Sequence, residues 1–312
     1  MTTRQIIQRL SALPGRIGLG EAAACDLLCD LLKRAGLSYR IQEFASQTPV
    51  FREASLTADG QPVACLPCGL VSGEITNNYH LISSLTSSQR FIDMPNINFN
   101  PKTDAICLCN FYHAPALAIS RRDVPRVMRA TTIRGRLVVE PQAYTARNIL
   151  LGNLTNPATV VFAHYDAYFA GATDNASGVA TVLQAVLENP QRLDTALVVL
   201  AGNEELSYDY PVYWGRCFRQ FNAAYPEVLR GAQQIVVVDS VGDGPPILER
   251  DPVLSKLAFP VADDELAAKT VIVTGHFDAL MRVYHSAADR PGRLRNHHLA
   301  ATIQTIGQLL DS

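Results

Sequence analysis

The sequence predicts an α/β fold, a three-layer α/β/α sandwich with a mostly parallel or mixed central sheet. Two observations predict it: from residue 158 onward, continuous apolar runs alternate with helical segments, and polar residues follow directly where those runs end. A strand buried on both faces gives a continuous apolar run, which requires helices on both sides of its sheet. The chain has 312 residues, of which 48% are hydrophobic, so it can bury a large core.

The first 115 residues predict two helices followed by short strands. Apolar residues recur at helical spacing over 3–12 and 20–36, and Gly36 marks the end of the second helix. Alternation predicts a strand over 38–44, and weaker strand candidates follow at 61–66, 78–84 and 104–109. Because 45–115 is rich in Asn, Pro and Ser, we expect one domain over 1–312 with an insertion or subdomain around 45–115.

The rest of the chain predicts strands that alternate with helices. The expected strands are 116–119, 135–139, 148–151, 158–163, 195–201, 234–239 and 270–274. The expected helices are 122–129, 176–188, one after Pro211, and 293–310. This repeated strand-loop-helix order is typical of a sheet with helices on both faces.

Composition and charge narrow the classes of partner. The chain carries 27 Lys+Arg against 29 Asp+Glu, a formal charge of -2, so we expect no binding to nucleic acid or to an anionic membrane surface. The first residues lack the apolar segment of a secretion signal, and no stretch reaches about 18 uncharged apolar residues. We therefore expect a cytoplasmic protein.

Seven cysteines leave two interpretations open. The Cys65–Cys68 CxxC pair and the Cys107–Cys109 CxC pair offer four thiolates for a zinc ion. They lack the usual paired CxxC spacing, so free buried thiols or one disulfide are favoured over a zinc site.

Polar side chains follow successive apolar runs, where the carboxyl ends of parallel strands meet. His164 and Asp166 follow the first run, Glu204 and Glu205 the second, and Asp239 the third. In open α/β sheets this edge is where ligands bind. Taken singly, each residue has a structural explanation, such as a helix cap or a satisfied histidine.

The combination of these residues needs a compensating charge. His285 follows the last strand and Asp174 lies in the loop after the first, so imidazoles and carboxylates gather where solvent is restricted. They are the ligand set suited to zinc, with Mn²⁺ or Co²⁺ as possible substitutes. Two histidines and three carboxylates suffice for two metal ions that share one carboxylate.

These residues resemble a known family, the M28 zinc metallopeptidases of aminopeptidase type. The resemblance rests on five motifs in order: HYD at 164–166, GATDNASGVA at 171–180, the EE pair at 204–205, Asp239, and YH at 284–285. It covers about 150–312, and the stretch from Leu13 to Phe44 also looks like the family's opening helix and strand. It implies a single zinc-peptidase catalytic domain.

The resemblance implies a role for each matching position. His164 and Asp239 would bind one zinc, Glu205 and His285 the other, and Asp174 would bridge the two. Glu204 would be the general base that activates a metal-bridging water and later protonates the leaving amine.

Further roles follow from the same resemblance. Asp166 would orient the His164 imidazole, and the Tyr284 hydroxyl would stabilise the oxyanion. The peptide bond after Asp174 is expected to be cis, as in many relatives. The loop 206–216 departs from the family pattern with aromatic and charged residues, which puts the substrate preference in doubt.

The expected function is a dizinc exopeptidase that removes N-terminal residues from peptides with a free N-terminus. The alternatives on the same scaffold are a glutaminyl cyclase, a carboxypeptidase or an amidohydrolase of N-acyl amino acids. A carboxypeptidase would need a cationic clamp for the terminal carboxylate, for which Arg216 or Arg282 are available. A non-catalytic interaction protein is less favoured, because every ligand and the base are present.

Nearby candidates have structural interpretations. Asp243 is expected in a turn, His276 at a helix start or in a loop, and His297 and His298 on the surface of the last helix. For Asp289, orienting a metal ligand and ending a loop are equally favoured.

Overall fold

The computed structural model describes residues 1–13, 15–86, 88–261 and 263–312. Within this part of the chain, nine strands form one sheet in the order β12-β13-β11-β9-β10-β8-β1-β2, with β4 paired to β8. Its strands are β1 (Arg40–Ala58), β2 (Gln61–Pro62), β4 (Gly73–Ile75), β8 (Ile133–Gly152), β9 (Thr159–His164), β10 (Ala196–Ala201), β11 (Gln234–Val238), β12 (Ile247–Glu249) and β13 (Thr270–Thr274).

The centre of this sheet is parallel and its two sides are antiparallel. Strand β9 pairs in parallel with β10 and β11, and β11 pairs in parallel with β13. Strand β8 is antiparallel to β10 and β1, and β12 is antiparallel to β13. Every residue of β9 and β10 is buried, as the continuous apolar runs predict. The predicted mixed sheet is confirmed.

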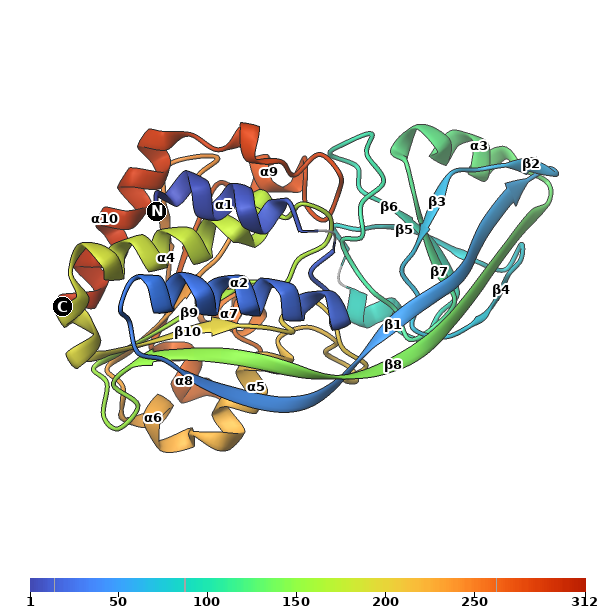
Figure 1. The fold of residues 1–312 in the computed structure, drawn as a ribbon. Helices are drawn as coiled ribbons and strands as arrows, with labels where there is room; N and C mark the ends of the chain where they lie inside the picture. The colour runs from blue at the N-terminus through green and yellow to red at the C-terminus, as the bar shows by residue number, and fades with distance from the viewer. Residues whose placement is uncertain (14, 87, 262) are drawn as a thin grey trace.

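Helices cover both faces of the sheet (Figure 1). The helices are α1 (Thr3–Ser11), α2 (Glu21–Arg34), α3 (Val124–Arg129), α4 (Ser177–Glu188), α5 (Arg216–Ala224), α6 (Pro226–Gly231), α7 (Pro252–Ala258), α8 (Asp264–Ala268), α9 (Phe277–Met281) and α10 (Asn296–Leu310). One core cluster unites side chains of α1, α2, α4 and α10 with the sheet. A second unites side chains of α5, α6 and α8 with the opposite face. Two apolar layers therefore fix the sheet from both sides.

A second sheet lies at the far end of the β1–β8 ribbon (Figure 1). It has the order β3-β7-β6-β5, with β3 (Cys65–Pro67), β5 (His80–Ser83), β6 (Asn96–Phe99) and β7 (Ala116–Ile119). The ribbon itself runs from the pair Arg40–Leu150 to the pair Ala58–Ile133, with a bulge between Phe51 and Glu53. The small sheet thus lies largely within the range 45–115 that we expected to be an insertion. The division into domains stays a prediction.

Two strand predictions are wrong. Residues 104–109 form no strand, because the backbone N–H of Leu108 bonds to the carbonyl of His285 across the molecule. The predicted strands 135–139 and 148–151 are parts of one strand, β8, because the polar segment between them pairs with β1 throughout. Tertiary pairing overrode the local pattern in both cases.

The opening and closing helices agree with their sequence signals. Thr2 and Gln5 form a reciprocal capping box at the start of α1, and Gly36 follows α2 with a φ of 70°, which favours glycine. No helix in the described ranges is both long and apolar enough to span a membrane. All seven cysteines are free thiols, so of the two favoured interpretations the structure shows free thiols and no disulfide.

Candidate metal centre

The predicted ligands come from adjacent parallel strands and meet at one edge of the sheet. His164 is the last residue of β9, Glu204 and Glu205 lie three and four residues past the end of β10, and Asp239 directly follows β11. Asp174 lies in the irregular turn η4 (Ala172–Ala176) before α4, and His285 follows α9. Since β9, β10 and β11 are parallel neighbours, their carboxyl ends bring these side chains together.

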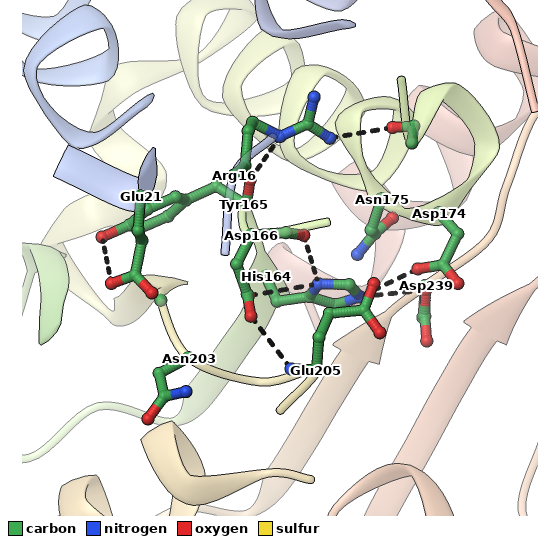
Figure 2. Close-up of polar contacts among 12 residues, drawn as sticks. Arg16, Glu21, His164, Tyr165, Asp166, Asp174, Asn175, Asn203, Glu205 and Asp239 are labelled. Carbon is green, nitrogen blue, oxygen red and sulfur yellow. Dashed lines mark hydrogen bonds and ion pairs between the residues drawn. The ribbon is translucent and has the colours of Figure 1, made fainter. Parts of the chain in front are cut away.

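The two oxygens of Asp174 face two separate groups of ligand atoms. Its Oδ1 lies 3.2 Å from His164 Nε2, which in turn lies 3.4 Å from Asp239 Oδ1 (Figure 2). Its Oδ2 lies 3.2 Å from His285 Nε2, which lies 2.7 Å from Glu205 Oε2. The two Asp174 oxygens therefore face separate ligand pairs, as those of a bridging carboxylate would.

The spacing of these atoms fits tetrahedral zinc. Ligands that bind zinc at about 2.0–2.1 Å in a tetrahedron lie about 3.3 Å from one another. Three of the four contacts are 3.2–3.4 Å long. One ligand atom each of His164, Asp174 and Glu205 also lies within 4.8 Å of the other two.

In both histidines the tautomer directs the lone pair of Nε2 toward the carboxylates. Nδ1 of His285 lies 2.9 Å from the Leu108 carbonyl oxygen, and Nδ1 of His164 lies 3.1 Å from the Asp166 carbonyl oxygen. A carbonyl oxygen only accepts, so each Nδ1 donates and the neutral ring presents an unprotonated Nε2. A lone pair that faces carboxylates requires a cation or a proton between them, so the residues fit a metal.

The charges of the site raise the pKa of both imidazoles. Burial alone would lower the pKa of His164, but its contacts with Asp166, Asp174 and Asp239 outweigh burial and raise it well above its usual range. Burial would also lower the pKa of His285. The Glu205 and Asp174 carboxylates outweigh burial there and raise the pKa well above its usual range. In the absence of metal, protons would therefore take the positions that a bound cation would occupy.

Glu204 and Glu205 differ from ordinary carboxylates. Burial raises the pKa of Glu205 to about 7, although the neighbouring His285 opposes the change. Burial, together with the Glu205, Asp166 and Asp239 carboxylates, raises the pKa of Glu204 well above its usual range against the opposing effect of His164. A raised pKa brings a carboxylate closer to the basicity that proton transfer at neutral pH requires.

Asp166 contacts two of the predicted ligands. Its Oδ1 lies 3.5 Å from His164 Nδ1, and its Oδ2 accepts a hydrogen bond of 2.9 Å from the Glu205 backbone N–H. Figure 2 shows the contacts of Asp166 with both residues as dashed lines. The hydrogen-bond partner of His164 Nδ1 is the Asp166 backbone carbonyl, at 3.1 Å, so the orienting role of the Asp166 carboxylate stays a prediction.

Tyr284 lies against its neighbour in the site. Its ring stacks on the His285 imidazole with the ring centres 3.8 Å apart. Burial and the Asp174 and Glu205 carboxylates raise the pKa of its hydroxyl, which keeps it a hydrogen-bond donor. Its oxyanion role stays a prediction.

The peptide bond between Asp174 and Asn175 is cis, as predicted. Asn175 has no assigned role in the sequence, but its Nδ2 donates to the Val238 carbonyl at 2.8 Å and its Oδ1 accepts from Ser240 N at 3.3 Å. It therefore ties the turn that carries Asp174 to the end of β11. Its place in the motif GATDNASGVA was the available signal.

Other sequence candidates are also placed by the structure. Leu108 is a missed contributor, because only its backbone contacts His285 and no side-chain pattern marks it. Asp289 contacts the Asp174 turn, whereas His276 occupies the N-cap position of α9 without a side-chain cap and Asp243 pairs with Arg293. In the described residues, no group of cysteines has the spacing for a metal, so the four-thiolate site is not formed.

The loop 206–216 is held by contacts within itself and with neighbouring elements. Asp209 pairs with Arg216 and, at 2.8 Å, with Arg219 Nη2, and Arg216 also donates to the Ala45 carbonyl. Trp214 Nε1 donates to the Leu257 carbonyl at 2.9 Å. Arg216 is therefore engaged inside the loop, while Arg282 is exposed.

Comparisons with known proteins agree with this fold. The model of Peptidase family M28 matches residues 149–238, and this confirms the resemblance that the motifs predict. No curated protein matches the sequence.

Solved structures share the fold along nearly the whole chain. A zinc aminopeptidase from Bacillus subtilis has a TM-score of 0.67 at 16% identity, over 98% of this chain and 93% of that one. An aminopeptidase from Aneurinibacillus sp. strain AM-1 has a TM-score of 0.66 at 15% identity, over 98% and 91%. A Porphyromonas gingivalis glutaminyl cyclase has a TM-score of 0.53 at 15% identity, over 99% and 96%.

Proposed function

We propose that this protein is a zinc-dependent metallopeptidase that removes N-terminal residues from peptides, with two zinc ions in the centre. The observation that carries the proposal is the arrangement around Asp174. One of its oxygens faces His164, which contacts Asp239, and the other faces His285, which contacts Glu205. The family match over residues 149–238 and the fold shared with zinc aminopeptidases support it. Mn²⁺ or Co²⁺ are proposed substitutes.

The residues of the chain divide the chemistry among them. Bound zinc would supply Lewis acidity toward the scissile carbonyl and would make water more acidic. The Glu204 carboxylate takes the proton of the attacking water and returns it to the leaving amine. The Tyr284 hydroxyl donates a hydrogen bond to the developing oxyanion.

The carboxylates also favour a substrate with a free amine. The Asp174 and Glu205 carboxylates lie against the two histidines, and Glu204 lies near Glu205 and Asp166, so hydrogen-bond acceptors gather at the centre. A protonated or hydrogen-bond-donating α-amine finds acceptors there, whereas an N-blocked peptide lacks that charge. This supports exopeptidase action at the N-terminus.

We further propose an intracellular location, which the seven free thiols support.

A glutaminyl cyclase is the second candidate, favoured by the fold that the chain shares with the Porphyromonas gingivalis enzyme. The paired ligand groups around Asp174 favour hydrolysis with two metals instead. A carboxypeptidase is less favoured, because Arg216 is engaged with Asp209 and Ala45.

The test is a substrate panel with metal-loaded wild type and Glu204→Gln. The panel contains aminoacyl-amides, N-acetylated peptides, peptides with N-terminal Gln and peptides assayed for C-terminal release. We expect turnover of free-amine substrates alone, and a loss of about 100- to 10,000-fold in kcat for Glu204→Gln with metal content unchanged.

The exposed Glu188→Gln on α4 is the matched control and should keep wild-type rates. The proposal fails if free-amine substrates are not hydrolysed, or if Glu204→Gln with two metals bound retains a rate close to wild type. A metal stoichiometry of one, with cyclisation of N-terminal Gln, would favour the cyclase.

A further inference from the structure

Arg16 is a buried cation that donates only to backbone carbonyls. Its side chain is 0% exposed. Nε donates to the Tyr165 carbonyl at 2.8 Å, Nη1 to those of Leu10 at 2.7 Å and Ala170 at 2.9 Å, and Nη2 to that of Gly171 at 3.0 Å. Figure 2 shows the guanidinium beside Tyr165. Within the described residues, no carboxylate oxygen forms an ion pair with it.

Asp289 is a buried anion that accepts only from backbone N–H groups. It is 2% exposed. Its Oδ1 accepts from Thr173 N at 2.9 Å, and its Oδ2 accepts from Thr173 N at 3.0 Å and from Asp174 N at 3.1 Å. It therefore holds the backbone of Asp174, whose two side-chain oxygens face the two groups of ligands.

The two charged side chains act on the same short segment. Arg16 binds the carbonyls of Ala170 and Gly171, and Asp289 binds the N–H groups of the two residues that end at Asp174. The segment is tightly packed: Gly171 has a φ of 47°, and a Cβ there would lie 2.7 Å from Arg16 Nη2. The position of the Asp174 backbone is thus fixed from both sides.

Arg16 also enters the charge balance of the centre. Six carboxylates lie in and around the centre, those of Asp166, Asp174, Glu204, Glu205, Asp239 and Asp289. Two divalent ions would supply four positive charges, and Arg16 adds one more to the cations that offset these carboxylates. Burial lowers the pKa of Arg16 to about 10, against the opposing effect of Asp166 and Glu205, so it remains a cation at neutral pH.

We propose that Arg16 and Asp289 are positioning residues that hold the Asp174 turn in its metal-binding geometry, each from one end of the segment 170–174. The inference rests on the metal centre of the proposed function and assigns to it two residues that bind no metal themselves. Groups that hold metal ligands in place set the affinity for the metal, so removing them weakens binding about 10- to 100-fold.

The experiment measures Zn²⁺ affinity by competition with a chelator, without any substrate. The variants are Asp289→Asn, Arg16→Lys and Arg16→Met in the full chain. We expect Asp289→Asn and Arg16→Met to bind Zn²⁺ about 10- to 100-fold more weakly than wild type. Arg16→Lys keeps the charge and should recover part of that loss. The absorption spectrum of bound Co²⁺ should change in Asp289→Asn, since the ligand geometry changes.

The matched control is Asp251→Asn, in which a carboxylate that caps α7 also accepts from two backbone N–H groups, those of Val253 and Leu254. It should bind Zn²⁺ like wild type. If Arg16→Met does not fold, Asp289→Asn and Arg16→Lys still decide the question. A lower melting temperature with Zn²⁺ affinity within twofold of wild type would overturn the inference, because it indicates a role in stability alone.

The result is separable from the peptidase test. Weaker Zn²⁺ binding in the variants supports the inference even if wild type hydrolyses no peptide. A wild-type protein that binds no Zn²⁺ would overturn both proposals, and an active wild type whose variants bind Zn²⁺ normally would overturn the inference alone.

Discussion

At the scale of single residues, the centre combines buried charges with unusual backbone. Four of the five described non-glycine residues with positive φ, namely Phe169, Asn203, Ser240 and His285, are in the site or adjoin a ligand segment. Such a conformation costs about 1–3 kcal/mol and persists where the surroundings fix it. Asn203 illustrates this: it bonds with Ser46, and its Nδ2 donates to the Leu206 carbonyl at 2.6 Å. The Glu204–Glu205 pair therefore starts from a fixed backbone.

The Tyr284 hydroxyl gives a prediction at this scale. Tyr284→Phe keeps the ring that stacks on His285 and removes only the proposed oxyanion donor. We expect kcat to fall about 100- to 1,000-fold with KM little changed, since the donor acts in the transition state. Steady-state kinetics on the best free-amine substrate would measure it. Tyr225→Phe, at the C-terminal end of α5, should have no effect. If Tyr284→Phe has the kcat of wild type, the Tyr284 hydroxyl does not stabilise the oxyanion.

At the scale of elements, the parallel strands predict the position of the site better than its details. Continuous apolar runs identify β9, β10 and β11, and their shared direction brings His164, Glu205 and Asp239 to one edge. The turn η4 and the segment after α9 complete the centre. Their conformation depends on contacts with Val238, Leu108 and Asp289 that are distant in sequence.

Gly178 at the start of α4 allows a test of one such contact. A Cβ there would lie 2.2 Å from Asn175 Oδ1, which accepts from Gly178 N at 3.0 Å. Gly178→Ala must displace Asn175, so we expect a loss of about 1–3 kcal/mol in the free energy of unfolding. Urea denaturation would measure it.

Gly231→Ala in α6 is the control, because a Cβ there meets no atom within 4 Å. It should leave stability unchanged or slightly higher, since Ala favours a helix more than Gly does. Equal stability of the Gly178→Ala variant and wild type would show that Asn175 is free to move.

At the scale of the whole molecule, the sheet and its two helical layers carry the centre, and the β1–β8 ribbon extends from them to the small sheet (Figure 1). The formal charge of -2 averages over the chain, whereas the buried carboxylates are concentrated at one edge of the large sheet. Metal binding should therefore contribute to the stability of the whole fold.

The pH dependence of that contribution is our prediction at this scale. In the metal-free protein, burial raises the pKa of Glu205 from 4.5 to about 7. A carboxyl whose pKa is higher in the folded state stabilises the fold at low pH, and this contribution is lost as the pH rises through the folded value. The raised pKa values of His164 and His285 act in the same direction.

We therefore expect zinc to raise the melting temperature more at about pH 8 than at about pH 5. Thermal unfolding of chelated and zinc-loaded protein at both pH values would measure the difference. A rise that is equal at both pH values, or larger at the lower one, would contradict the charge arrangement described here.

The sequence by itself determined the mixed α/β sheet, most of its strands and helices, and the identity of the residues that meet at its edge. It could do so because burial on both faces produces continuous apolar runs, and because the direction of parallel strands brings their ends together. His164, Asp174, Glu205, Asp239 and His285 are all brought together as predicted.

Only the tertiary structure decided the extent of β8, the absence of a strand at 104–109, and the contacts of Arg16, Leu108 and Asp289 with the centre. These features depend on backbone N–H and carbonyl groups, which every residue carries and which no side-chain pattern distinguishes. A buried arginine that binds four carbonyls leaves no local signal, because its partners are defined by the fold and not by their residue types.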